Sequence, residues 1–373
     1  MRYRLQNRIA QSSLTLPTAC VVATLLWWLP QGGYSTDYLL GWLICALAVY
    51  FVIETTAINQ LLRIRSRMIS SLVLLLMAAC GFLHPLQTGT VIFLCMTVSF
   101  YCLFRTYDHP RPEVNTFHAY LMISLGSLLW PPLLLLVLMQ FWNQVVFLRS
   151  MSGKSLGATL IGFLLPYFFW AGGAFVLGQM QPFVNHAEAI IAPVSEPVRN
   201  ALDGGALFPK TYMEWLGFEG QDEQNNTETA QNCWQATASA AQHTDWNGFC
   251  ANFICWLNTR WPQMAALVFV LLLGLTGFIH YVCKSYDDKI SVRMCHYCFM
   301  AMQVVVILWM ALQPQHFRLL FPLLILTTAP AAAHFIALTR TWWTNAWFIL
   351  LTIGLLAVGV CCLSESLLDT IKP

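Results

Sequence analysis

The sequence predicts an all-α fold, a polytopic bundle of about eleven transmembrane helices with one acidic outward loop. The first observation is composition, since 58% of the 373 residues are hydrophobic and only 10% are charged. Soluble globular proteins carry about 25% charged residues, and the mean hydropathy here is +0.61. The second is a series of apolar runs close to the roughly 20 residues that cross a bilayer. The third is a single region in which carboxylates gather.

Eleven apolar runs are candidate spans. The first follows the basic segment MRYRLQNRIAQ, and because no small-x-small cleavage site comes after it, we expect a retained helix rather than a removed signal peptide. The runs are 14–30, 38–57, 69–86, 89–104, 116–130, 132–148, 156–178, 262–283, 292–312, 318–338 and 345–364.

The number of crossings in residues 115–150, NTFHAYLMISLGSLLWPPLLLLVLMQFWNQVVFLRS, determines which side of the membrane each later loop faces. Read as one helix, this stretch would be about 50 Å long, well beyond the hydrocarbon core. Pro131 and Pro132 stand in its middle, where proline removes a backbone donor and disfavours helix in the preceding residue. We therefore predict a helical hairpin over 116–148, with Trp130 as an interfacial anchor at its tip.

Lysine and arginine are retained on the cytoplasmic side of short loops, which orients the bundle. With the N-terminus inside and the hairpin in place, the C-terminus is outside. Fourteen basic residues then lie inside: Arg2, Arg4, Arg8, Arg63, Arg65, Arg67, Arg105, Arg111, Arg149, Lys154, Lys284, Lys289, Arg293 and Arg340. Five lie outside: Arg199, Lys210, Arg260, Arg318 and Lys372.

Three regions follow: helices one to seven over 1–178, an extracytoplasmic acidic loop over 179–261, and helices eight to eleven over 262–373. The loop would face the periplasm or the outside of an inner (plasma) membrane. In that oxidising compartment one disulfide is allowed. Cys233 would bridge to Cys250 or to Cys255, unless Cys255 has already entered the next membrane interface as a small apolar residue.

The motif MCHYC holds Cys295 and Cys298 three residues apart, with His296 between them. Residues i and i+3 share a helix face, so metal ligation is geometrically possible. A second C-x-x-C is missing, and we favour packing in the core. We predict no metal and no cofactor. The net charge of only +2 and the lack of a basic binding motif also predict no nucleic-acid partner.

Ionisable side chains inside a membrane normally mark a transport path or proton relay. We find no carboxylate in the middle of any predicted span, which argues against a carrier built on a buried acid. Four histidines are expected near inner helix ends: His118, His280, His296 and His334.

Another group is expected near outer helix ends: Asp37, His84, His316 and Arg318. If these helices adjoin, His84, His316 and Arg318 could bind an anionic head group at the outer leaflet. Asp37, His316 and Arg318 are also the candidates for a catalytic role. The alternative is that all four are ordinary interfacial residues in contact with water and lipid phosphates.

Three segments carry a resemblance: SLGSLLWPPLLLLVLMQFWNQVVFLRS, GATLIGFLLPYFFWAGG and FRLLFPLLILTTAPAAAHF. Over residues 60–180 and 300–360 the chain resembles an uncharacterised family of bacterial multi-pass inner-membrane proteins, known as a domain of unknown function. It is also faintly similar to glycosyltransferases and polymerases that use lipid-linked sugars, in which an arginine opens a proline-containing late helix, as Arg318 does here. Those transferases carry a long first outer loop with a catalytic acid, whereas here the loop is QGGYSTD, with Asp37 alone.

Three functions are consistent with these features. The first is cell-envelope biogenesis, in which the protein handles a lipid-linked saccharide or an anionic lipid at the outer face. The second is a transporter or flippase of a small or lipidic solute. The third is a non-catalytic subunit that binds another membrane protein through the acidic loop.

Overall fold

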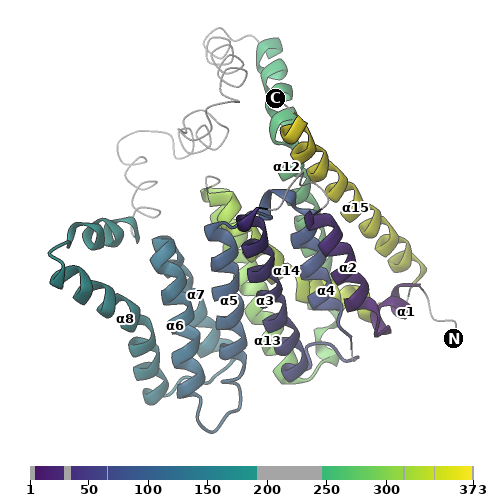
Figure 1. The fold of residues 1–373 in the computed structure, drawn as a ribbon. Coiled ribbons are helices and arrows are strands. Elements are labelled where there is room, and N and C mark those ends of the chain that lie inside the picture. Colours follow the sequence, from purple (N-terminus) through teal and green to yellow (C-terminus); the bar gives the residue numbers. More distant parts are fainter. Residues whose placement is uncertain are drawn as a thin grey trace.

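The computed structural model describes residues 5–28, 35–64, 66–190, 246–313, 316–339 and 341–371. Within these residues 86% are helical and there is no strand. The helices run alongside one another as a bundle (Figure 1). A helix satisfies its own backbone hydrogen bonds, as a chain surrounded by lipid requires. The predicted all-α fold class is confirmed.

The α-helices of the first half of the bundle range from 7 residues in α1 to 24 residues in α3 and α8. Before the acidic region the elements are α1 (Leu5–Gln11), α2 (Thr15–Trp28), α3 (Thr36–Asn59), α4 (Met68–Ala79), η1 (Gly81–Leu83), α5 (Thr88–Phe104), α6 (Glu113–Leu129), η2 (Pro131–Leu134), α7 (Leu135–Trp142), the π-helix η3 (Asn143–Phe147) and α8 (Gly153–Val176). After it come α12 (Trp246–Lys284), η4 (Ser285–Asp287), α13 (Ile290–Leu312), α14 (Phe317–Leu338) and α15 (Trp342–Ile371).

Six helices of the described chain are long and apolar enough to cross a membrane: α3, α8, the Trp261–Asp287 part of α12, α13, α14 and the Trp342–Cys362 part of α15. The other five predicted runs fall on shorter helical segments, among them α2, α4, α5 and Pro131–Phe147. A multi-pass membrane protein is therefore supported, while the number eleven stays a prediction.

The chain turns at Trp130, between the two arms of the predicted hairpin. Trp130 is extended (φ −140°, ψ 99°) and directly precedes Pro131, as expected for a residue before proline. The arms are antiparallel, since Gln144 at the end of the second arm meets the start of α6. Its Nε2 donates to Thr116 Oγ1 at 3.0 Å, and its Oε1 accepts from Tyr120 Oη at 3.0 Å.

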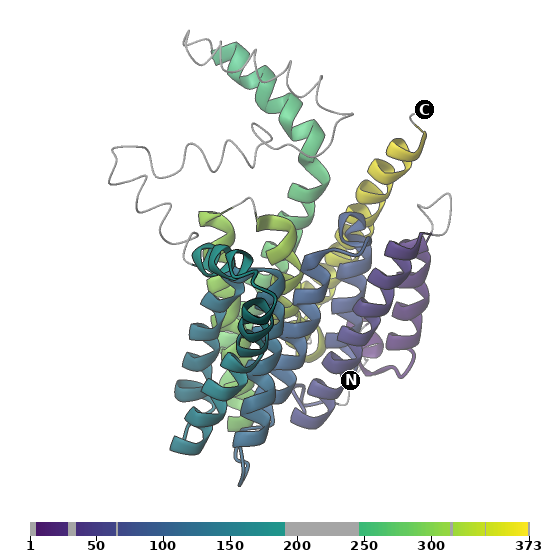
Figure 2. The same ribbon diagram turned by 60° about the vertical axis from the view of Figure 1, so that its left-hand side comes forward.

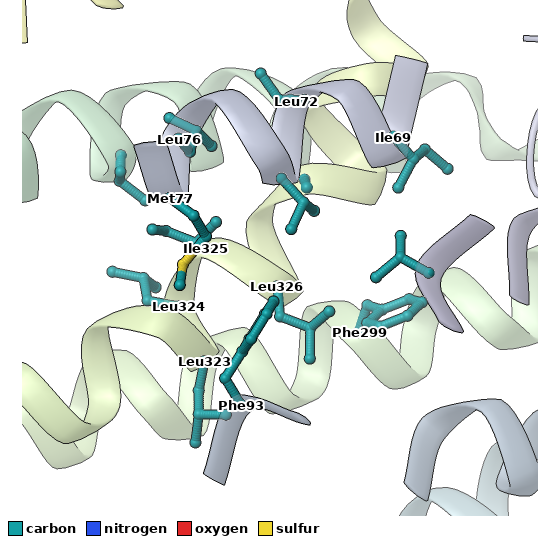
Figure 3. Packing of buried hydrophobic residues seen from close by; sticks show 14 of the residues in the cluster. Ile69, Leu72, Leu76, Met77, Phe93, Phe299, Leu323, Leu324, Ile325 and Leu326 are labelled. Carbon is teal, nitrogen blue, oxygen red and sulfur yellow. The ribbon is translucent and has the colours of Figure 1, made fainter. Parts of the chain in front are cut away.

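Helix α14 is the centre of the bundle, because 94% of its most apolar 18-residue stretch is buried, against 22% for α8. Leu323, Leu324, Ile325 and Leu326 of α14 pack against α4, α5 and α13, as Figure 3 shows. The helix contains Pro322 and Pro330. Each proline leaves a backbone carbonyl of the helix without its hydrogen bond. Membrane helices tolerate such prolines because neighbouring helices and side chains can satisfy the freed group.

Small residues let α12 approach α14 closely. A Cβ added to Gly277 would lie 2.6 Å from the backbone nitrogen of Ala332. In a membrane, where lipid removes the hydrophobic drive to associate, such close backbone contact is a main source of helix–helix attraction. The A-A-A run before His334 therefore fixes how α12 and α14 cross.

Helix α12 begins inside the predicted acidic loop. The loop is predicted over 179–261, and α12 runs from Trp246 through Pro262, whereas the part of it that is long and apolar enough to cross a membrane begins at Trp261. Phe249, Phe253 and Leu257 recur every four residues, so the helical pattern starts before the uniformly apolar run. The early part of α12 projects beyond the bundle (Figures 1 and 2). Residues 181–190 are helical as well.

Candidate functional site

The predicted outer group comes from neighbouring helix ends. The backbone N–H of Leu86 donates to the carbonyl of Asp37 at 3.0 Å. On the other side of the same turn, a Cβ added to Gly89 would lie 2.8 Å from the carbonyl oxygen of Arg318. The chain over 84–89 therefore lies between the first turn of α3 and the first turn of α14.

The side chains of this group do not converge. His84 is 1% exposed, stacks on Trp27 with ring centroids 4.2 Å apart, and has Nε2 2.9 Å from the carbonyl oxygen of Ala78. It therefore joins α2 to α4 and faces the interior. Asp37 and Arg318 are exposed.

His316 packs beside aromatic rings at the same end. Its ring lies edge-on to Trp130, with centroids 5.1 Å apart, and Trp130 stacks on Trp309 at 5.2 Å. Trp309 Nε1 donates to Gln313 Oε1 at 3.1 Å. This stack places the hairpin tip against α13 and the start of α14. No carboxylate within the described residues pairs with the Arg318 guanidinium.

A second polar group lies at the other end of α14. We call it the Asp288 cluster, and it comprises Arg63, His280, Tyr281, Asp288, His296 and His334. Asp288 follows η4, and its side chain is 1% exposed. Its Oδ1 accepts from Arg63 Nε at 2.5 Å, and its Oδ2 lies 3.1 Å from His334 Nε2. One buried carboxylate thus joins the turn after α3, the turn after α12 and the central helix.

Three rings surround the His334 imidazole. Its centroid lies 4.8 Å from that of Tyr281, 5.4 Å from that of His280 and 5.8 Å from that of His296. Tyr281 and His296 stack with centroids 4.4 Å apart and planes 8° from parallel. The Nδ1 atoms of His280 and His334 are buried without a hydrogen-bond partner in the described chain.

The ion pair keeps Asp288 charged. Burial by itself would raise the pKa of the carboxyl group, but the hydrogen bonds and charges of His334 and Arg63 outweigh burial and lower the pKa to about 2. Burial would likewise lower the pKa of Arg63, and hydrogen bonding to Asp288 raises it instead. Arg63 Nη1 also lies 3.5 Å from Asp287 Oδ2, at a half-exposed position.

Sequence reasoning placed three of these histidines near helix ends of the same side but missed Asp288. The available signal was the pair Asp287-Asp288 in the short turn KSYDDKI, where two acids interrupt an otherwise basic side. What the sequence could not supply was that α12, α13 and α14 bring their histidines to one place.

The cysteine predictions have different outcomes. Cys233 lies outside the described residues, and Cys250 and Cys255 belong to the part of α12 of which only the backbone is described, so the disulfide stays a prediction. Cys295 and Cys298 are buried in the apolar core. Within the described residues no group of three histidine, cysteine or acidic side chains is arranged to hold a metal ion.

Comparisons of the chain with protein-family models, with curated proteins and with solved structures found no match.

Proposed function

We propose that the chain crosses an inner membrane eleven times, with the Asp288 cluster at the cytoplasmic side and the acidic region outside. The fourteen-to-five distribution of lysine and arginine supports this orientation. Besides the six long apolar helices, the shorter apolar helices α2, α4, α5 and Pro131–Phe147 support the larger count.

The orientation has a direct test. Single cysteines placed near Asn226 and near Arg65 in a cysteine-free variant would be treated with a membrane-impermeant thiol reagent in intact cells. The site near Asn226 is expected to react, and the site near Arg65 only after the membrane is opened. The reverse pattern would overturn the proposed sidedness.

At the outer face, we propose that the protein binds an anionic lipid or a lipid-linked saccharide through Arg318. The observation that carries this function is an exposed arginine without an acidic partner among the described residues, in the first turn of the central helix. Helix N-termini attract anions, and guanidinium binds phosphate in a bidentate manner. The faint similarity to enzymes that use lipid-linked sugars points to the same ligand class.

The binding test uses purified protein in detergent with a polyprenyl diphosphate as the probe, monitored by native mass spectrometry. Arg318→Ala is expected to reduce the bound fraction at least fivefold. Arg111→Ala, which removes an exposed arginine at the other end of the bundle, serves as the matched control and should bind like the wild type. Equal binding by Arg318→Ala and wild type would remove this function.

Complementation in cells then separates binding from activity. Arg318→Ala and His316→Ala are expected to lose activity while still inserting in the membrane. Normal growth with both variants would argue against a role in envelope biogenesis. The alternative of a non-catalytic subunit instead predicts that deletion of residues 219–245 releases a co-purifying membrane protein.

The packed centre favours this lipid-handling function over a transporter. A transporter needs a water-accessible path to the middle of the membrane, whereas apolar side chains surround α14 (Figure 3). Beside Pro330 the cavity between α3, α4, α5, α13 and α14 has a volume of about 10 Å³, which is room for about one water molecule.

A further inference from the structure

We propose that a cavity between α2, α3 and α4 binds one hydrocarbon chain of a membrane lipid. Helices α2 and α3 both pack against α4, and the side chains between the three helices leave a space of about 150 Å³. The proposal relies on the membrane setting of the bundle and does not depend on what Arg318 binds.

The cavity follows one face of α2. The α2 residues that line it recur at helical spacing and therefore share a single face of the helix: Leu16, Cys20, Ala23, Thr24 and Trp27. Leu16 and Trp27 are eleven residues apart, which corresponds to a length of roughly 16 Å. The small side chains between them leave the space, and the large ones close its two ends.

Helix α3 repeats this pattern with the same spacing. Its lining residues are Trp42, Cys45, Ala46, Val49, Tyr50 and Ile53. Trp27 Nε1 donates to the carbonyl of Tyr38 at 3.2 Å, so Trp27 and Trp42 close the same end of the cavity. The space is therefore elongated along two neighbouring helices, which is the shape of an extended chain rather than of a compact ligand.

The lining selects hydrocarbon. None of the described residues that line the cavity is charged. The hydroxyl of Thr24 already donates to the carbonyl of Cys20 at 2.8 Å. A polar ligand would give up its hydrogen bonds to water here at a large cost in free energy. An apolar cavity of this size stays dry and accommodates benzene, which makes room for about six carbon atoms of a chain.

The cavity opens between the middles of two apolar helices. Cys20 and Tyr50, which lie away from the ends of α2 and α3, are exposed, whereas Ala23, Cys45 and Leu74 are buried. The middle of a helix that crosses a bilayer faces lipid chains rather than water, so hydrocarbon is what reaches this opening. A chain that enters regains the dispersion contacts that an empty space lacks.

Photolabelling of the full chain in lipid nanodiscs tests the proposal. The probe is phosphatidylglycerol with a diazirine in the middle of one acyl chain, and adducts are located by mass spectrometry. Leu74 lines the cavity, while Leu72 of the same helix does not. Because the two side chains are 9% and 8% exposed, surrounding lipid reaches them equally. The yield at Leu74 is expected to be at least fivefold higher.

Filling the cavity should prevent labelling. Ala46→Phe places a ring in the space, and the yield at Leu74 is expected to fall at least fivefold. Labelling of Leu164, an exposed residue of α8, should not change. The matched control is Leu47→Phe, at an exposed neighbouring position of α3 that does not line the cavity, and it should label like the wild type.

Competition with unlabelled lipids identifies the source of the chain. A larger reduction of Leu74 labelling by a polyprenyl phosphate than by phosphatidylglycerol identifies an isoprenoid chain, and the opposite order identifies a fatty acyl chain. In both cases a hydrocarbon chain occupies the cavity, as proposed.

Two results would overturn the proposal: equal yields at Leu74 and Leu72 in the wild type, or undiminished labelling of Leu74 in Ala46→Phe. The first comparison needs no variant, so it decides the matter even if Ala46→Phe does not fold. None of these outcomes bears on binding of a polyprenyl diphosphate by Arg318.

Discussion

Arg63 and Asp288 form an ion pair although they are 225 residues apart in the chain. The Asp288 side chain is 1% exposed and the Arg63 side chain 38% exposed. The charge of the carboxylate therefore needs the ion pair far more than the charge of the arginine, which water can reach. Since Asp288 also contacts His334, this pair connects the first part of the bundle to its central helix.

Loss of Arg63 should destabilise the protein more than loss of Asp288. Arg63→Ala leaves a buried carboxylate without its arginine, whereas Asp288→Asn leaves an arginine that water can reach. Breaking a buried pair costs roughly 3–5 kcal/mol, and partial exposure reduces this to about 2 kcal/mol for Arg63→Ala. Thermal unfolding in detergent measures which variant loses more stability, with Arg111→Ala as the control. A smaller loss for Arg63→Ala than for Asp288→Asn would contradict this assignment.

The stabilisation by Asp288 should disappear in acid. The folded-state pKa, about 2, is below the ordinary value of 3.8. A group with a depressed pKa stabilises the fold above its unfolded pKa and loses that effect as the pH falls through the folded pKa. The difference in melting temperature between wild type and Asp288→Asn should therefore be constant above about pH 5 and shrink between pH 4 and pH 2. A difference that stays constant down to pH 2 would show that the pair is not ionised as described.

Gly277→Ala should weaken the contact between α12 and α14. The new Cβ would lie 2.6 Å from the backbone nitrogen of Ala332 and 2.7 Å from the carbonyl carbon of Ala331, and backbone atoms of a central helix cannot move aside. Overpacking of this kind costs roughly 1–3 kcal/mol. The matched control is Gly172→Ala in α8, where nothing lies within 4 Å. That change should stabilise α8 slightly, since alanine favours helix over glycine by about 1 kcal/mol. Equal melting temperatures for the two variants would argue against the close crossing.

Gln144→Leu should loosen the hairpin of α6 and the Pro131–Phe147 segment. The buried amide joins Thr116 to Tyr120. Its removal leaves the buried Tyr120 hydroxyl without this acceptor, whereas Thr116 Oγ1 still donates to the carbonyl of Pro112. An unsatisfied buried group costs about 1–3 kcal/mol. Limited proteolysis at the 148–152 turn should therefore become faster. Leu138→Ala, at a side chain that is 71% exposed, is the control and should be cleaved at the wild-type rate.

The sequence by itself indicated that lipid surrounds much of this protein and that its fold is all-α. Apolar runs of nearly bilayer length permit only helices, because each must satisfy its own backbone. The prolines after Trp130 likewise located the turn inside 115–150, since their effect is local. Helix α12 begins at Trp246, before the predicted span, because hydropathy marks only the apolar part of a helix, whereas the four-residue spacing before it marks the earlier part.

Only the tertiary structure decided which side chains meet. Asp37, His84 and Arg318 come from adjoining helix ends, which the sequence left open, and His84 turns inward onto Trp27. Asp288, which no local pattern distinguished from Asp287, is the one that reaches His334. The reason is physical: hydropathy depends on residues close together in the chain, whereas an ion pair depends on how distant helices cross and rotate.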